Sequence, residues 1–178
     1  NNGAMDLSSG NGNVGIYSAY KSGNGIARNY ANIKVGKTDL ENELYSIGMA
    51  AVYTNKDRPS ENKVGHVINM AGSTITVGNE NSIGMYASGA GSTAENNGTI
   101  RITAKKGIGM YLENGATGIN GASGLIEIDA AAQNAIAVYS TGASTVFKNY
   151  GTIRIKAPTS KGIVTANGAN NNVIAGNI

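Results

Sequence analysis

The chain has 178 residues, 40% of them hydrophobic, which suffices for one domain with one core. Glycine (26) and asparagine (24) dominate while charged residues make up only 14%, a composition that disfavours both helix bundles and disorder. The absence of cysteine excludes a disulfide framework, and a single histidine excludes a multi-histidine metal site. The net charge of +3 comes from scattered basic residues, so we expect no nucleic-acid partner and no cofactor.

Two short apolar units recur along the chain with a period of about 25 residues. The first unit is apolar–small–apolar, and its copies are Val14–Ile16, Ile47–Met49, Ile83–Met85, Ile108–Met110, Ile136–Val138 and a degenerate Lys161–Ile163. The second unit has isoleucine followed two positions later by an apolar residue: Ile33–Val35, Ile75–Val77, Ile100–Ile102, Ile126–Ile128, Ile153–Ile155 and a new start at Ile178. The two series interleave, so one structural unit is repeated about six times.

Both units alternate as a strand with one buried face does, and we expect the apolar residues on either side of the small residue to point inward. Bends rich in glycine and asparagine separate the units, and a repeat of about 25 residues leaves no room for a helix. The pattern predicts an all-β fold, a right-handed parallel β-helix (β-solenoid) of about six coils, where a coil is one turn of the solenoid.

We expect residues 1–178 to form a single β-helix segment of a longer protein, with inserted loops near 37–45 and 53–63. The second insertion contains Pro59 and a cluster of charges, and insertions in solenoids often lie on the binding face. Its candidate ligand-binding residues are Tyr53, Lys56, Asp57 and Arg58. A passively tolerated loop is the alternative.

Tyrosine recurs two positions after the small residue of the first unit. In three consecutive coils this position holds Tyr86, Tyr111 and Tyr139, which we expect to point outward and to stack one per coil. Such a row is either a structural aromatic ladder or a strip of rings that can stack on sugars. These three tyrosines complete the set of candidate ligand-binding residues.

Two polar columns are also predicted. Asn29, Asn96 and Asn149 each lie four positions before the isoleucine of the second unit, and stacked asparagines can form hydrogen bonds along the axis of a repetitive β structure. Within the second unit, the middle position reads Lys34, Thr76, Arg101, Glu127 and Arg154. Because the flanking residues point inward, we expect these five side chains to point to solvent and to alternate in charge over the last three.

No pattern supports catalysis or metal binding. The glycine motif Gly10–Gly15 runs into a strand rather than into a helix, so it is no dinucleotide site. His66 follows the second insertion and is interpreted as a polar loop residue. The aspartates are scattered along the chain, and in a glycosidase-like pair Glu127 would point outward from a strand while Asp129 would lie beyond it in the bend. We therefore expect no catalytic residue.

The repeats Ser82–Tyr86, Asn97–Ile100 and Gly107–Tyr111 resemble those of passenger domains of monomeric (type V) autotransporters, and most closely those of the large fusobacterial surface adhesins. The resemblance spans essentially the whole chain. It implies a right-handed β-helix, export to the bacterial cell surface, and anchoring in the outer membrane by another part of the protein. It also implies adhesion to host cells or other bacteria.

The expected function is therefore a non-catalytic adhesin segment whose partner is a cell-surface receptor, protein or glycan. We expect a monomer that is not itself embedded in a membrane. A spacer whose binding site lies elsewhere in the full protein is the alternative, and a polysaccharide-active enzyme on the same fold is a more distant one.

Overall fold

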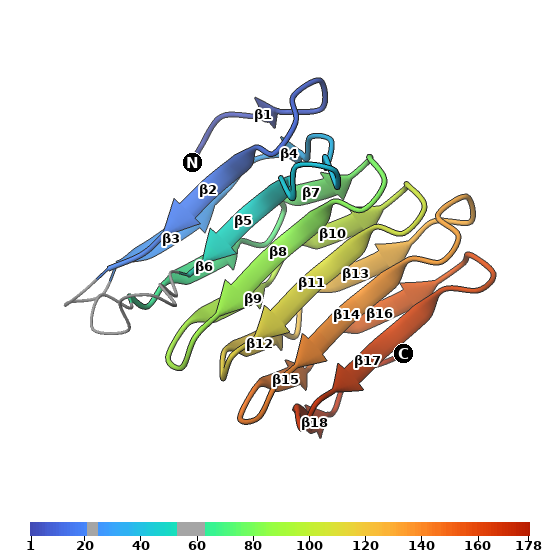
Figure 1. Ribbon diagram of the computed structural model, residues 1–178. Coiled ribbons are helices and arrows are strands. Elements are labelled where there is room, and N and C mark those ends of the chain that lie inside the picture. Colours follow the sequence, from blue (N-terminus) through green and yellow to red (C-terminus); the bar gives the residue numbers. More distant parts are fainter. Residues whose placement is uncertain (21–24, 53–62) are drawn as a thin grey trace.

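The computed structural model describes residues 1–20, 25–52 and 63–178. Within them every regular element is a β-strand, and the strands stack in parallel in three sheets of six to form a β-solenoid (Figure 1). The chain passes through the three sheets in turn, and each coil adds one strand to each sheet. The solenoid has about five turns. The predicted parallel β-helix is confirmed, and the expected six coils are close; the handedness remains a prediction.

The three sheets are named here after their characteristic residues. The isoleucine sheet contains β1 (Met5–Asp6), β4 (Ile33–Lys34), β7 (Thr74–Val77), β10 (Thr99–Ile102), β13 (Leu125–Ile128) and β16 (Thr152–Ile155). The tyrosine sheet, in front in Figure 1, contains β2 (Val14–Ser18), β5 (Ile47–Ala51), β8 (Ile83–Ser88), β11 (Ile108–Glu113), β14 (Ile136–Thr141) and β17 (Lys161–Ala166). The asparagine sheet contains β3 (Ile26–Asn29), β6 (His66–Asn69), β9 (Thr93–Asn96), β12 (Thr117–Asn120), β15 (Val146–Asn149) and β18 (Asn170–Ile174).

The core lies between the sheets and repeats from coil to coil. The isoleucines that open the second sequence unit pair in register, as Ile75 with Ile100 and Ile100 with Ile126, and all three are fully buried. Methionines of the tyrosine sheet, such as Met85 and Met110, meet them from the other side and are also fully buried. Alternation along the isoleucine strands therefore directs one face inward, as the sequence predicts.

The tyrosine sheet departs from strict alternation at the small residue. A Cβ added to Gly84 would lie 3.0 Å from Ile100 Cγ2 in the core, so this position faces inward. Met85 is fully buried as well, whereas Ile47 and Ile108, each one position before a glycine, are partly exposed, and Ile83, before Gly84, is 6% exposed. Two successive inward positions interrupt the alternation, so the residue before the glycine points outward. The expectation that the residue before the glycine points inward is therefore wrong.

The same geometry explains why the small residue is small. A Cβ on Gly84 would lie 2.7 Å from the carbonyl oxygen of Gly109 in the next coil, a backbone atom that cannot move aside cheaply. Gly84→Ala should therefore lower the free energy of unfolding by about 1–2 kcal/mol, as overpacking does. The value stays modest because Ala137 occupies the equivalent position in a later coil.

Urea denaturation measures this cost, and Gly78→Ala is the matched control. A Cβ on Gly78 would have its nearest neighbour, Thr103 Oγ1, at 3.7 Å, an ordinary contact distance. The control should be neutral or slightly stabilising, since alanine restricts the unfolded chain. Equal losses in the two variants would contradict the close approach of the coils.

An asparagine ladder runs along the corner that follows the asparagine sheet. Its five members are fully buried and lie in register: Asn29, Asn69, Asn96, Asn120 and Asn149. The side-chain amide of each of the first four donates to the side-chain oxygen of the asparagine in the next coil at 2.8–2.9 Å, always toward the C-terminus. The predicted column of Asn29, Asn96 and Asn149 is confirmed, with Asn69 and Asn120 lying between these three.

Asn69 and Asn120 do not show the four-residue spacing to the next isoleucine, because the bend that follows each of them is longer. Asn96 precedes Ile100 by four positions, whereas Asn69 precedes Ile75 and Asn120 precedes Ile126 by six. The ladder and the isoleucine row nevertheless stay in register in all of these coils. Two extra residues are therefore accommodated within the bend itself.

His66 is the first residue of β6, not a loop residue, so that expectation is wrong. It pairs with Ile26 and Thr93 in the asparagine sheet, and its Nε2 lies 3.7 Å from Glu95 Oε2. The alternation of His66 with the buried Val67 continues the strand pattern back to this position, which the nearby insertion obscures in the sequence.

Candidate functional site: an aromatic groove on the tyrosine sheet

The predicted row of tyrosines exists on the outer face of the tyrosine sheet. Tyr86, Tyr111 and Tyr139 are register partners on β8, β11 and β14. The ring centroids of Tyr86 and Tyr111 are 5.7 Å apart, and those of Tyr111 and Tyr139 are 5.2 Å apart, with tilted planes. The three rings therefore form a continuous strip across three coils. In the other coils the same position holds Tyr17, Ala50 and Val164.

A second outward row runs beside the tyrosines. It consists of the residues before the small residue, among them Ile47, Ile83 and Ile108, which pair from coil to coil. Between the two rows lies a groove of about 330 Å³. We call it the tyrosine groove; it is lined by Tyr45, Ile47, Asn81, Ile83, Tyr86, Ile108, Tyr111 and Glu113.

Tyr45 comes from the first insertion, and the folding of that loop explains its position. Asp39 and Leu44 form an antiparallel bridge, and the Asp39 carboxylate accepts hydrogen bonds from the backbone of Glu41 and Asn42. Thr38 Oγ1 donates to the carbonyl of Asn81, at 3.0 Å, in the turn before β8. The loop is thereby attached to the next coil, and Tyr45 forms one end of the groove.

The polar groups of the groove are arranged around a single carboxylate. The Tyr86 hydroxyl donates to Glu113 Oε1. Burial, and secondarily this carboxylate, raises the pKa of Tyr86. Burial is also the main cause that raises the pKa of Tyr111, with Glu113 adding to it. Both phenols therefore stay neutral, and Glu113 is the one charged side chain among the residues that line the groove.

The sequence identified part of this site. Tyr86 and Tyr111 line the groove, and Tyr139 extends the strip by one coil. The candidates Tyr53, Lys56, Asp57 and Arg58 lie outside the described residues. Sequence reasoning missed Tyr45, Glu113 and the isoleucine row. In a regular strand a spacing of three, as between Ile83 and Tyr86, places two residues on opposite faces, so the sequence carried no signal that both line one groove.

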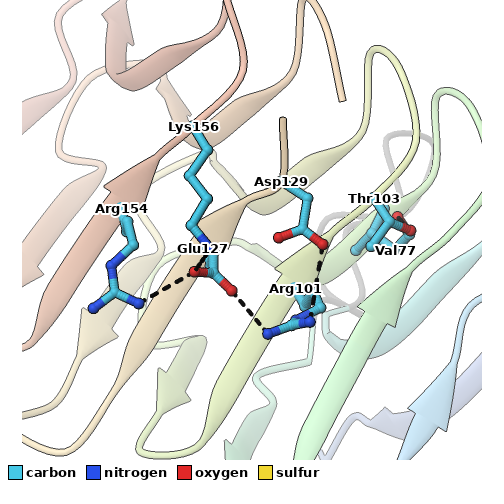
Figure 2. Close-up of polar contacts among 7 residues, drawn as sticks. All are labelled: Val77, Arg101, Thr103, Glu127, Asp129, Arg154 and Lys156. Atoms are coloured by element: carbon cyan, nitrogen blue, oxygen red, sulfur yellow. Dashed lines mark hydrogen bonds and ion pairs between the residues drawn. The ribbon is translucent and has the colours of Figure 1, made fainter. Parts of the chain in front are cut away.

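The charged column lies on the outer face of the isoleucine sheet. Arg101, Glu127 and Arg154 are register partners, as predicted. Figure 2 shows them converging with Lys156 on Glu127, at N–O distances of 2.9 Å for Arg101, 3.2 Å for Arg154 and 2.6 Å for Lys156.

The column differs from the prediction in one respect. The Glu127 side chain is only 2% exposed, because the three cations cover it, so it points outward without reaching solvent. Lys156 is the largest cause that holds the pKa of Glu127 below its ordinary value. Asp129 lies 3.9 Å from Arg101, at the edge of the cluster. The Glu127 carboxylate is thus occupied by its ion pairs with Arg101, Arg154 and Lys156.

Neither a metal site nor a membrane-spanning helix is found among residues 1–20, 25–52 and 63–178. No group of three or more histidine, aspartate or glutamate side chains there is placed to hold a metal ion. No helix there has the length and hydropathy needed to cross a membrane.

These features define a β-solenoid domain with an aromatic groove on one outer face. A family model described as the BigA third pectate lyase-like domain matches residues 1–124, more than half of the chain. The chain belongs to this family. Membership of this family is consistent with a domain of a bacterial surface protein. To that extent it agrees with the resemblance to autotransporter passenger domains. No curated protein and no solved structure matches the chain.

Proposed function

We propose that the chain is a non-catalytic segment of a bacterial cell-surface adhesin, exported as part of an autotransporter passenger like those of the large fusobacterial adhesins. The observation that carries the proposal is the tyrosine groove. It places apolar and aromatic side chains on the outside of a regular stack of strands, where a soluble protein gains from covering them with a partner. The partner is a receptor on a host or bacterial cell surface.

The charges on the isoleucine sheet support a non-catalytic role. A general acid or base needs a carboxyl group that can reach a substrate and exchange a proton. Glu127 is covered by three cations, and Arg101 lies near Asp129 as well. The family description nevertheless makes pectate cleavage the second candidate function.

Binding of the fluorescently labelled chain to cells tests the proposal. We expect saturable binding to host epithelial cells or to other bacteria in flow cytometry, displaced by excess unlabelled chain. Binding to no cell type would contradict it and favour a spacer role. Incubation with polygalacturonate should release no new reducing ends or unsaturated products, and their release would instead establish the pectate-cleaving alternative.

A further inference from the structure

We infer that the tyrosine groove binds a neutral, extended, β-linked oligosaccharide that lies along the solenoid axis, with about one sugar ring per coil. The inference rests on the proposed adhesive function and specifies the chemistry of the receptor. It follows from three properties of the groove: its aromatic spacing, its polar groups and its ends.

The aromatic spacing matches a chain of sugar rings. Pyranose rings in β-linked chains present flat C–H faces, which pack on aromatic rings. The tyrosine rings recur every 5.7 and 5.2 Å, because each coil is separated from the next by one strand spacing. This repeat is close to the length of one pyranose unit in an extended chain. A sugar chain that follows this row can therefore contact Tyr86, Tyr111 and Tyr139 in turn without a change of direction.

The polar groups select against charge. Sugar hydroxyls need hydrogen-bond partners at the edges of the stacked rings, and the groove offers the phenolic hydroxyls, the Glu113 carboxylate and Asn81. No lysine or arginine lines the groove, and its one charge is negative. A uronic acid or a sulfated sugar would therefore be repelled by Glu113 and would find no cation there. The residues that line the groove therefore favour an uncharged ligand.

The two ends of the strip limit the length of the ligand. Tyr45 stands at the N-terminal end, held there by the loop attached to Asn81. At the other end the strip stops after Tyr139, where the next coil places Val164. A ligand of about four sugars fills this length, at one ring for each strand spacing.

Isothermal titration calorimetry with cellotetraose and chitotetraose tests the inference, with tetragalacturonate as the acidic probe. We expect at least one neutral tetrasaccharide to bind and tetragalacturonate not to bind. Tyr111→Val and Tyr86→Ala should each weaken binding about tenfold, since each removes one stacked ring. Both substitutions copy residues that the chain itself uses in this row, Val164 and Ala50, so the variants should fold; circular dichroism checks this.

Tyr150→Val is the matched control, because Tyr150 is 43% exposed in the bend after β15, away from the tyrosine sheet. It should bind like the parent. Failure of both neutral tetrasaccharides to bind, equal loss in the control, or tighter binding of tetragalacturonate overturns the inference. Adhesion to cells decides the proposed function separately: if cells are bound and no tetrasaccharide is, the inference alone fails.

Discussion

Replacing Glu127 with lysine should lower the free energy of unfolding by about 3 kcal/mol. The substitution removes the partner of Arg101, Arg154 and Lys156 and places a fourth cation in a buried position. Breaking a buried ion pair costs about 3–5 kcal/mol, and the lower end applies because the three cations are about half exposed and remain hydrated. Urea denaturation at low ionic strength measures the loss, which should shrink as salt screens the repulsion.

Two controls separate repulsion from lost pairing. Glu127→Gln keeps the shape and removes only the charge, so it should cost clearly less than Glu127→Lys. Lys34→Gln removes an exposed ion pair with Asp6 in the same column and should change stability by less than about 1 kcal/mol. If Glu127→Lys unfolds like the parent, the three cations do not converge on this position.

The same cluster gives a pH dependence with a defined sign. Lys156 and the two arginines lower the pKa of Glu127 from its ordinary value of 4.5 in the folded state. The unfolded chain therefore binds the proton more readily, and the ion pairs stabilise the fold fully above about pH 4.5. This contribution is lost as the pH falls through the lowered value. Glu127→Gln should flatten the decrease in melting temperature over that acidic range.

Asn96→Ala should be similarly costly, at about 3 kcal/mol. Asn96 accepts from Asn69 and donates to Asn120, both at 2.9 Å and both fully buried. The substitution leaves a donor of Asn69 and an acceptor of Asn120 without this partner, and an unsatisfied buried polar group costs about 1–3 kcal/mol. Denaturant unfolding followed by circular dichroism measures the loss.

Two further variants sharpen this prediction. Asn96→Asp should cost more than Asn96→Ala, because a carboxylate cannot donate to Asn120 and carries a charge into a buried site. Asn97→Ala alters the adjacent, half-buried amide, whose side chain donates to Glu95 outside the ladder, and should cost less than about 1 kcal/mol. Similar losses for Asn96→Ala and Asn97→Ala would show that the ladder adds nothing beyond an ordinary surface amide.

The repeat made the fold predictable, because residues that recur at one period must occupy equivalent positions in successive coils. Ile100, Ile126 and Ile153 pair as their spacing indicates, and so do Tyr86, Tyr111 and Tyr139. The inward position of Gly84 beside the inward Met85 was not predictable from alternation, because it recurs in each coil and leaves the residue spacing unchanged.

The site was less predictable than the fold for a related reason. Tyr45 belongs to an insertion with no counterpart in other coils, so its place depends on contacts such as that of Thr38 with Asn81. Lys156 lies one residue beyond a predicted strand, and its contact with Glu127 depends on how the chain leaves β16. A period relates equivalent residues to one another, but it carries no information about side chains that occur once.

The one-way direction of the asparagine ladder bears on how such a protein changes its length over evolution. Each coil receives a hydrogen bond from the coil before it and offers one to the coil after it, as Asn96 does between Asn69 and Asn120. A duplicated coil inserted into the stack would meet the same donor on one side and the same acceptor on the other. Bends that differ by two residues already coexist along this corner. Tandem duplication can therefore lengthen the solenoid one coil at a time. At each new junction the asparagine donor and acceptor find partners without any further substitution.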